Sequence, residues 1–269
     1  MTITLPNIHP TAIVEDGAKV SNSCKIGPYC CVGPEVTLDH NVCLVSHVVV
    51  SGRTFIGRGT KVWPFSSVGS EPQDLKYNGE KSTLTIGQNN LIRECVSIST
   101  GTDGGGGITS IGNNCLFMLG SHVGHDCKLG DNIIIANNSA IAGHVIIEDN
   151  VNIGGLVGVH QFCRIGEGSM IGAHAMVSKD IIPFSMIVGM RPVLSGVNLV
   201  GLKRRGSKRE DMKKIVDVFS RLFEKKGNQS FQERLEAIDK DELFQITEVQ
   251  KVIKFMKQES TRSYVAPKT

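Results

Sequence analysis

Residues 129–159 read LGDNIIIANNSAIAGHVIIEDNVNIGGLVGV, and an aliphatic side chain recurs there at every sixth position. These positions are Leu129, Ile135, Ile141, Ile147, Ile153 and Val159. A period of six matches neither the 3.6-residue helix nor the alternation of a half-buried strand. It fits short strands separated by sharp corners, with each hexapeptide forming one side of a coil. Three sides would close a triangular coil, and parallel pairing would stack successive coils about 4.8 Å apart.

The same period covers roughly residues 8–190 and is interrupted by two polar inserts. The earlier positions are Ile8, Val14, Val20, Ile26, Val32, Leu38, Leu44, Val50, Ile56, Val62, Val68, Ile86, Ile92 and Ile98. After a shift of one residue they are Ile111, Phe117, Val123, Leu129, Ile135, Ile141, Ile147, Ile153, Val159, Ile165, Ile171 and Val177. Residues 69–85 preserve the frame, whereas residues 99–110 (STGTDGGGGITS) shift it. Long loops on a rigid scaffold commonly carry function, but we interpret the run GGGG by itself as an idle solvated loop.

Cysteines follow the repeat. The fourth residue after each aliphatic position is usually small, and Cys24, Cys30, Cys115, Cys127 and Cys163 occupy that slot. We therefore expect buried thiols that fill small inward sites, with no disulfide or catalytic role. The absence of a C-x-x-C pair also argues against a zinc knuckle.

Composition limits the class of protein. Aromatic residues make up 5% of the 269 residues, whereas 30 are glycine, which suits a core of small and β-branched side chains with many tight corners. A net charge of +3 is too small to argue for nucleic-acid binding. No apolar run is long enough for an integral membrane segment, and the N-terminus does not resemble a secretion signal. We expect a cytoplasmic protein.

The repeat ends near Pro192, and helical patterns follow. We predict a β-helical domain over residues 1–190 and a small α-helical domain over residues 191–269. Ser207 and Ser230 each precede a glutamate by three residues, which is typical of a capping box at a helix start. Apolar residues at helical spacing are Ile215, Val218, Phe219, Leu222, Val249, Val252, Ile253 and Met256. The tail after Glu259 is expected to fray.

Stacking converts sequence spacing into proximity. In a coil of three hexapeptides, Asp126 lies under His144, and His125 lies under Gly143 and then Gln161. The residues expected along this one edge are His122, His125, Asp126, His144, His160 and Gln161. Four clustered histidines could bind zinc, as in a β-helical carbonic anhydrase. That family places two histidines five residues apart, whereas His122 and His125 are three apart. A histidine beside an aspartate instead favours an acid–base pair, and we predict no metal.

Five ordered motifs carry a specific resemblance. They are PQDLKYNGE at 72–80, SHVGHDC at 121–127, AGHV at 142–145, VHQFC at 159–163 and GVNLVGLKRRG at 196–206. Together they resemble the acyl-[acyl-carrier-protein]–UDP-N-acetylglucosamine O-acyltransferase family, which opens lipid A biosynthesis, over nearly the whole chain. The resemblance implies a left-handed parallel β-helix, a helical C-terminal domain, no cofactor, and a homotrimer with its sites at subunit clefts.

The implied reaction transfers an acyl chain, usually 3-hydroxyacyl, from acyl carrier protein to the sugar 3-hydroxyl of UDP-N-acetylglucosamine. By resemblance, His125 is the general base, Asp126 orients it, and the Gly143 N–H stabilises the oxyanion. The resemblance further implies substrate-binding roles for His122, His144, His160, Gln161, Gln73, Asp74, Lys76, Asn198, Arg204 and Arg205. A basic patch formed by Lys203, Arg204, Arg205, Lys208 and Arg209 would steer an acidic carrier protein.

Two departures from the family pattern stand out. The chain reads Ser99-Thr100-Gly101-Thr102 where members commonly read HRGT, so a histidine and an arginine on the nucleotide side are absent. Ala173 replaces a frequent glycine at the position that measures acyl length, which predicts a shorter chain. The sequence leaves open an amino-sugar acceptor, acetyl-CoA as donor, a zinc carbonic anhydrase and a non-catalytic scaffold.

Overall fold

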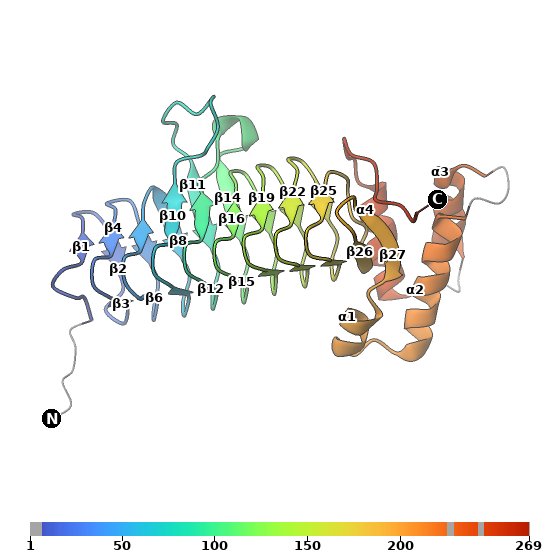
Figure 1. The fold of residues 1–269 in the computed structure, drawn as a ribbon, viewed down its shortest axis with the longest axis horizontal. Helices are drawn as coiled ribbons and strands as arrows, with labels where there is room; N and C mark the ends of the chain where they lie inside the picture. Colours follow the sequence, from blue (N-terminus) through green and yellow to red (C-terminus); the bar gives the residue numbers. More distant parts are fainter. Residues whose placement is uncertain (1–6, 225–228, 242–244, 269) are drawn as a thin grey trace.

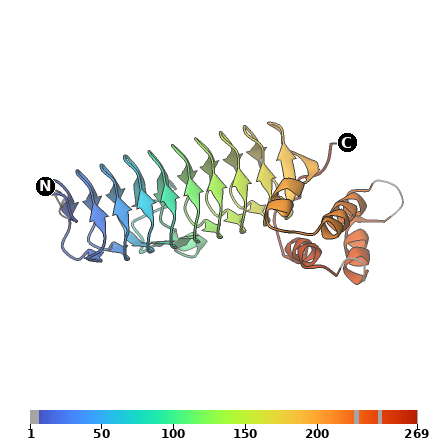
Figure 2. The same ribbon diagram turned by 90° about the horizontal axis from the view of Figure 1, so that it is seen from below.

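A computed structural model describes residues 7–224, 229–241 and 245–268. Within these ranges the chain winds into a long three-sided prism, with helices gathered at its C-terminal end (Figures 1 and 2). Strands pair in parallel with the strand one coil later, so that Ile135 pairs with Ile153 and Ile141 with Val159. This register confirms the triangular coil that the six-residue period predicts.

The described strands form three sheets, called A, B and C below. Sheet B contains β1 (Ile13–Val14), β4 (Cys31–Val32), β7 (Val49–Val50), β10 (Ser67–Ser70), β13 (Ser97–Ser99), β16 (His122–Val123), β19 (Ala140–Ile141), β22 (Gly158–Val159) and β25 (Met176–Val177). Sheet C contains β2 (Lys19–Val20), β5 (Thr37–Leu38), β8 (Arg53–Ile56), β11 (Thr83–Ile86), β14 (Ile108–Ile111), β17 (Lys128–Leu129), β20 (Ile146–Ile147) and β23 (Arg164–Ile165). Sheet A contains β3 (Lys25–Ile26), β6 (Cys43–Leu44), β9 (Lys61–Val62), β12 (Leu91–Ile92), β15 (Leu116–Phe117), β18 (Ile134–Ile135), β21 (Asn152–Ile153), β24 (Met170–Ile171), β26 (Ser185–Val188) and β27 (Val193–Val197).

The aliphatic positions of the repeat fill the prism. Ile135, Ile141 and Phe117 are fully buried, whereas Ile8 in the first coil stays 42% exposed. The five slot cysteines are buried and free, as expected. Burial raises the pKa of the Cys127 thiol to about 12, which removes the thiolate that a catalytic or metal-binding cysteine requires.

Both inserts leave the prism from the same edge and lie beside each other (Figure 1). Residues 71–82 connect β10 to β11, and residues 100–107 connect β13 to β14 through a short 3₁₀ turn, η1 (Asp103–Gly105). The sheet continues under them, because β11 pairs along its four residues with both β8 and β14. The inserts are therefore additions to an unbroken scaffold.

Helices close the C-terminal end. They are α1 (Leu199–Arg204), α2 (Arg209–Leu222), α3 (Phe231–Lys240) and α4 (Thr247–Lys257). The predicted apolar positions of α2 and α4 are buried. A buried ion pair joins Arg164 Nε to Asp180 Oδ2 at 2.8 Å, and the Arg164 guanidinium lies 4.4 Å from the centre of the Phe255 ring. The contact between Arg164 and Phe255 joins α4 to the last coils of the prism.

Two local predictions about this end are wrong, and one is confirmed. Ser230 and Glu233 form the expected capping box. Ser207 does not cap α2, because Lys208 is the N-cap and the Ser207 hydroxyl bonds Glu248 Oε1 on α4. The tail after Glu259 is ordered: Val265 is buried, and its N–H donates to the Asp180 carbonyl. No helix in the described ranges has the length and apolarity needed to span a membrane.

Candidate active site

The predicted His–Asp pair lies at the corner between sheets B and C. His125 and Asp126 follow β16, and one coil later His144 follows β19 at the same corner. Asp126 and His144 adopt left-handed backbone conformations, with φ of 60° and 62°. Many other corner positions carry asparagine, which tolerates this conformation better than other L-residues. Aspartate and histidine also occur in this conformation more often than most L-residues, so the corner accommodates both side chains.

Asp126 is buried and held by several donors. Its Oδ2 lies 2.7 Å from His125 Nδ1. The Thr102 N–H donates to Oδ1 at 2.8 Å, and the Thr102 hydroxyl donates to Oδ2 at 2.6 Å. A carboxylate only accepts hydrogen bonds, so the proton of the contact with His125 sits on Nδ1. In the neutral ring the Nε2 atom of His125 then carries no proton and can act as a base.

His144 and His122 flank this pair. The His144 ring meets the His125 ring edge-on with centres 4.9 Å apart, and it stacks on Phe162 at 4.4 Å. Burial lowers the pKa of His144, despite the nearby charge of Asp126. Burial, followed by the proximity of His125, lowers the pKa of His122. Both flanking imidazoles are thus held toward the neutral form.

A cleft of about 460 Å³ opens over the sheet B face beside His125. It is lined by Gln73, Ser99, His122, Gly124, His125, Ala140, Ala142, Gly143, Gly158, Val159, His160, Gln161, Met176, Val177 and Ser178. A Cβ on Gly143 would lie 2.6 Å from His125 Nε2, so glycine is required for the ring to fit. Gly143 therefore lies against the basic nitrogen of His125, as the stacking arithmetic predicts.

The first insert borders the same cleft. Gln73 lines it, and Asp74 lies near His125 and His144. The pKa of Asp74 is lowered, first by the Lys76 N–H that donates to its Oδ1 at 3.0 Å and then by the nearby Lys76 ammonium. The exposed Lys76 ammonium belongs to this loop. The structure therefore brings Gln73, Asp74 and Lys76 to the predicted edge.

A second group of predicted residues lies elsewhere. Asn198, Arg204 and Arg205 line a separate cleft of about 590 Å³ on sheet A. The Asn198 amide is engaged within the chain, because its Oδ1 accepts from the Gly201 N–H at the start of α1 and its Nδ2 donates to the Gly168 carbonyl. One protomer therefore does not gather all the predicted substrate-binding residues into one cleft.

Ala173, the predicted acyl-length residue, does not line the cleft beside His125. It is exposed near the corner between sheets A and B, whereas Met176, Val177 and Ser178 line the C-terminal end of the cleft. The predicted role of Ala173 in acyl length thus concerns a surface outside the cleft of its own protomer.

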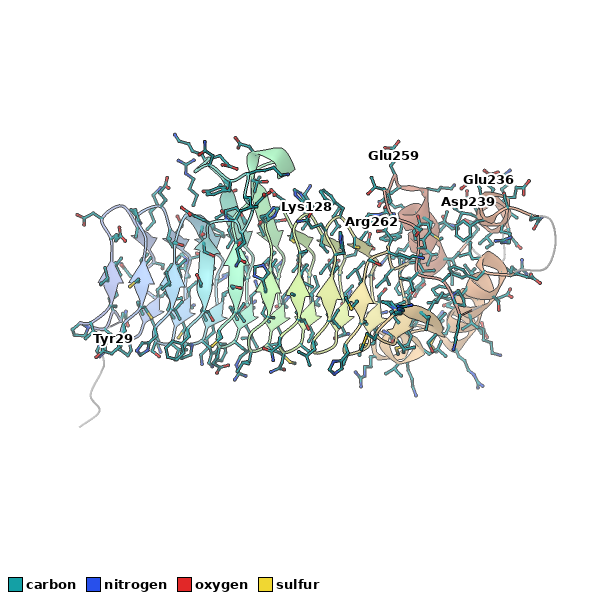
Figure 3. All side chains as sticks on the ribbon, turned by 45° about the horizontal axis from the view of Figure 1, so that its top comes forward. Tyr29, Lys128, Glu236, Asp239, Glu259 and Arg262 are labelled. Carbon is teal, nitrogen blue, oxygen red and sulfur yellow. The ribbon has the colours of Figure 1, made fainter. Side chains whose placement is uncertain are left out.

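Three contacts of the site are not predicted by the sequence motifs. Thr102, which belongs to the departure from HRGT, and Gly105, which belongs to the GGGG run, both lie against Asp126, so the interpretation of that run as idle is wrong. Arg262, labelled in Figure 3, belongs to the tail after Glu259. One of its guanidinium nitrogens donates to His160 Nδ1 and to the Gln161 carbonyl, both at 2.9 Å.

One possible metal-ligand group occurs among the described residues. His125, Asp126 and His144 offer atoms within 4.8 Å of one another. To coordinate an ion through these atoms, Asp126 would have to give up its hydrogen bonds to His125 and Thr102. The residues present fit the acid–base arrangement better than a zinc site.

The prism of six-residue repeats, with its polar edge, indicates the class of hexapeptide-repeat transferases. Comparison with known proteins identifies the family. Residues 108–143 and 144–179 match the bacterial transferase hexapeptide repeat. Residues 180–265 match the second domain of UDP-N-acetylglucosamine O-acyltransferases.

Relatives and solved structures agree with these matches. The Agrobacterium fabrum acyl-[acyl-carrier-protein]–UDP-N-acetylglucosamine O-acyltransferase is 42% identical over 97% of this chain and 95% of its own length. The Paracoccus denitrificans protein of the same name is 50% identical over 77% of each chain. A crystal structure of UDP-N-acetylglucosamine O-acyltransferase from Moraxella catarrhalis superposes with a TM-score of 0.91 at 38% identity, covering 96% of this chain and 99% of that one. The chain belongs to the acyl-[acyl-carrier-protein]–UDP-N-acetylglucosamine O-acyltransferase family, and its fold is the expected left-handed parallel β-helix.

Proposed function

We propose that this protein transfers an acyl chain from acyl carrier protein to the 3-hydroxyl of UDP-N-acetylglucosamine, the first step of lipid A biosynthesis. Its relatives are named acyl-[acyl-carrier-protein]–UDP-N-acetylglucosamine O-acyltransferases, which supports the donor, the acceptor and an O-acyl transfer. The observation that carries the proposal is the His125–Asp126 contact of 2.7 Å, which leaves Nε2 unprotonated at the edge of a cleft.

The chemistry follows from these atoms. His125 Nε2 removes the proton of the sugar hydroxyl while its oxygen attacks the thioester carbonyl. Asp126 stabilises the imidazolium that forms. The Gly143 N–H donates to the oxyanion of the tetrahedral intermediate. The carbon–sulfur bond then breaks, and the departing thiolate takes the proton from His125, which restores the base.

Neutral flanking histidines suit this cycle. A cationic His122 or His144 would oppose formation of the His125 imidazolium, and burial disfavours that charge on both. We assign His122, His144, His160 and Gln161 to positioning the sugar and the acyl chain. Arg262 donates to His160 Nδ1, so the Nε2 atom of His160 carries the proton.

The first insert provides the nucleotide-sugar side. Gln73 and Asp74 would contact the sugar, and Lys76 would pair with a phosphate. In the second insert Ser99 is buried and lines the cleft, and Thr100 accepts a hydrogen bond from Ser82. By the resemblance, small hydroxyl residues stand here where family members commonly carry histidine and arginine.

A homotrimer would reunite the two separated groups of residues. The cleft with His125 lies on sheet B, and the cleft with Arg204 and Arg205 lies on sheet A. Exposed apolar side chains mark the corner between these sheets, including Tyr29 at 59% and Phe65 at 65% exposure. Packing such corners around a threefold axis would bury them and set sheet B of one protomer against sheet A of the next.

Subunit mixing tests the shared site. His125→Ala and Arg204→Ala variants are each expected to be weak, and co-expression should restore activity where one subunit supplies His125 and its neighbour supplies Arg204. Light scattering gives the oligomeric state independently. Activity in mixtures no greater than the average of the two variants would contradict a shared site.

The carrier protein would dock at the basic patch formed by Lys203, Arg204, Arg205, Lys208 and Arg209. A groove of about 420 Å³ between α1 and α2 adjoins the patch. It is lined by Leu199, Val200, Lys203, Arg209, Met212, Lys213 and Val216. Apolar walls with a cationic rim fit an acidic partner helix that has its own apolar stripe. This partner and the acyl-chain substrate are consistent with a cytoplasmic location.

The function is tested by offering acyl carrier proteins loaded with chains of several lengths, together with UDP-N-acetylglucosamine or its 3-amino analogue. Product mass identifies the donor and acceptor together. We expect transfer to the 3-hydroxyl, and no transfer to either sugar would overturn the proposal.

A further inference from the structure

We propose that the glycine-rich insert, residues 99–110, is a clamp on Asp126 in which Thr102 and Gly105 act as positioning residues. The role deepens the proposed function, on which it rests, because it names what holds the orienting carboxylate of the base. Neither residue contacts the cleft, so both act through Asp126.

Thr102 fixes the rotation of the carboxylate. The Thr102 N–H donates to Oδ1 of Asp126 and its hydroxyl donates to Oδ2, so the two hydrogen bonds together determine the plane of the carboxylate. Oδ2 then faces His125 Nδ1. Thr102, Asp126 and His125 form a continuous buried chain of hydrogen bonds that ends at the basic nitrogen.

The other end of the insert, at Thr109, contacts the main chain of Asp126. The Asp126 N–H donates to Thr109 Oγ1 at 2.8 Å. Asp126 has a φ of 60°, the left-handed conformation that recurs at the corners of this prism, so its main chain turns there toward the insert. Thr102 and Thr109 therefore hold Asp126 through its side chain and its main chain.

Gly105 closes the space over the carboxylate. A Cβ added there would overlap Cγ and both oxygens of Asp126. The neighbouring Gly104 differs, because a Cβ added there would meet nothing within 4 Å, and its φ is not in the left-handed region. The GGGG run thus contains one glycine that is required by contact with Asp126 and one that is free, in adjacent positions.

This contrast provides a matched pair of variants. Gly105→Ala should displace the carboxylate and lower kcat by about 10- to 100-fold with little change in KM, the range expected for losing a well-placed charged hydrogen bond. Gly104→Ala should stay within about twofold of the parent enzyme. Thr102→Val should resemble Gly105→Ala, and Thr102→Ser should recover most of the loss.

A double-mutant cycle separates positioning from folding. In an Asp126→Ala background the added methyl of Gly105→Ala has room, and its effect should vanish. Circular dichroism confirms that each variant is folded. A Gly105→Ala loss of equal size in both backgrounds, or no difference between Gly104→Ala and Gly105→Ala, would overturn the clamp.

Nitrogen NMR of His125 gives a readout that needs no turnover. Asp126 holds the proton of the neutral ring on Nδ1, so Gly105→Ala should lower the share of this tautomer relative to Gly104→Ala. The other groups near the ring, His122, His144, Asp74 and Lys76, are the same in both variants. Absence of transfer by the parent enzyme would refute the proposed function, whereas identical His125 tautomer populations in the two variants would refute the clamp.

Discussion

Replacing Asp126 by asparagine should damage the enzyme more than removing the side chain. The Thr102 N–H donates to Oδ1, so it would retain the asparagine carbonyl at that place. The amide NH₂ would then face His125 Nδ1 across the present 2.7 Å contact and donate to it. His125 would carry its proton on Nε2, and the base would be lost.

The size of the effect follows from the role of a general base. Such a base contributes about 10²- to 10⁴-fold to the rate, which is about 3–5 kcal/mol in the activation barrier. Asp126→Asn should therefore lose most of that factor. Asp126→Ala leaves the imidazole free to choose either tautomer, so it should lose only about 10- to 100-fold.

The assay is steady-state transfer from acyl carrier protein, followed by product mass, with nitrogen NMR to identify the His125 tautomer. The reasoning predicts that alanine is the milder substitution and that the asparagine variant shows a protonated Nε2. Equal activity of the two variants, or an asparagine variant near the parent rate, would refute it.

Four further outcomes are expected. Burial lowers the pKa of His122 from 6.5, so as the pH falls the unfolded chain takes up a proton on His122 before the folded chain does. Stability to heat should therefore fall as the pH drops below 6.5 and through the lowered pKa of the folded state. A stability profile that His122→Gln leaves unchanged would contradict this. Asp180→Asn should cost about 3–5 kcal/mol in chemical denaturation because it strands the buried Arg164 charge, and a loss below about 1 kcal/mol would count against the pair. Ala173→Gly should shift acyl preference toward longer chains in a competition assay, and an unchanged preference would exclude Ala173 as the ruler. Arg262→Ala should lower kcat/KM by about tenfold because a cleft histidine loses its orienting donor, with Arg262→Lys intermediate, and a parent-like alanine variant would dismiss that role.

The repeating part of the structure is predictable because a single local rule fixes it. Each aliphatic position points inward, and parallel pairing places residues of successive coils over each other, so Ile135 over Ile153 and His125 beside Gly143 follow from counting. The same counting gives the cluster of histidines at one edge. The burial of the slot cysteines follows equally directly.

The contacts that the six-residue period does not predict involve irregular segments. Thr102 lies 24 residues before Asp126, across an insert that breaks the period, so the repeat does not predict their hydrogen bonds. Arg262 reaches His160 from a tail whose course depends on how Phe255 of α4 packs on Arg164 and how the tail bonds Asp180. The role of Asn198 is implied by the resemblance alone, and β27, which joins sheet A, places this residue on another face than His125.

Purified protein, a 3-hydroxyacyl carrier protein and UDP-N-acetylglucosamine provide the most direct test of the central claim, with His125→Ala as the matched variant. Mass spectrometry should detect the 3-O-acyl sugar nucleotide with the parent enzyme and at most about one-hundredth of that rate with the variant. A failure of the parent enzyme to acylate the sugar, or a His125→Ala variant as fast as the parent, would contradict the assignment of His125 as the base of this acyl transfer.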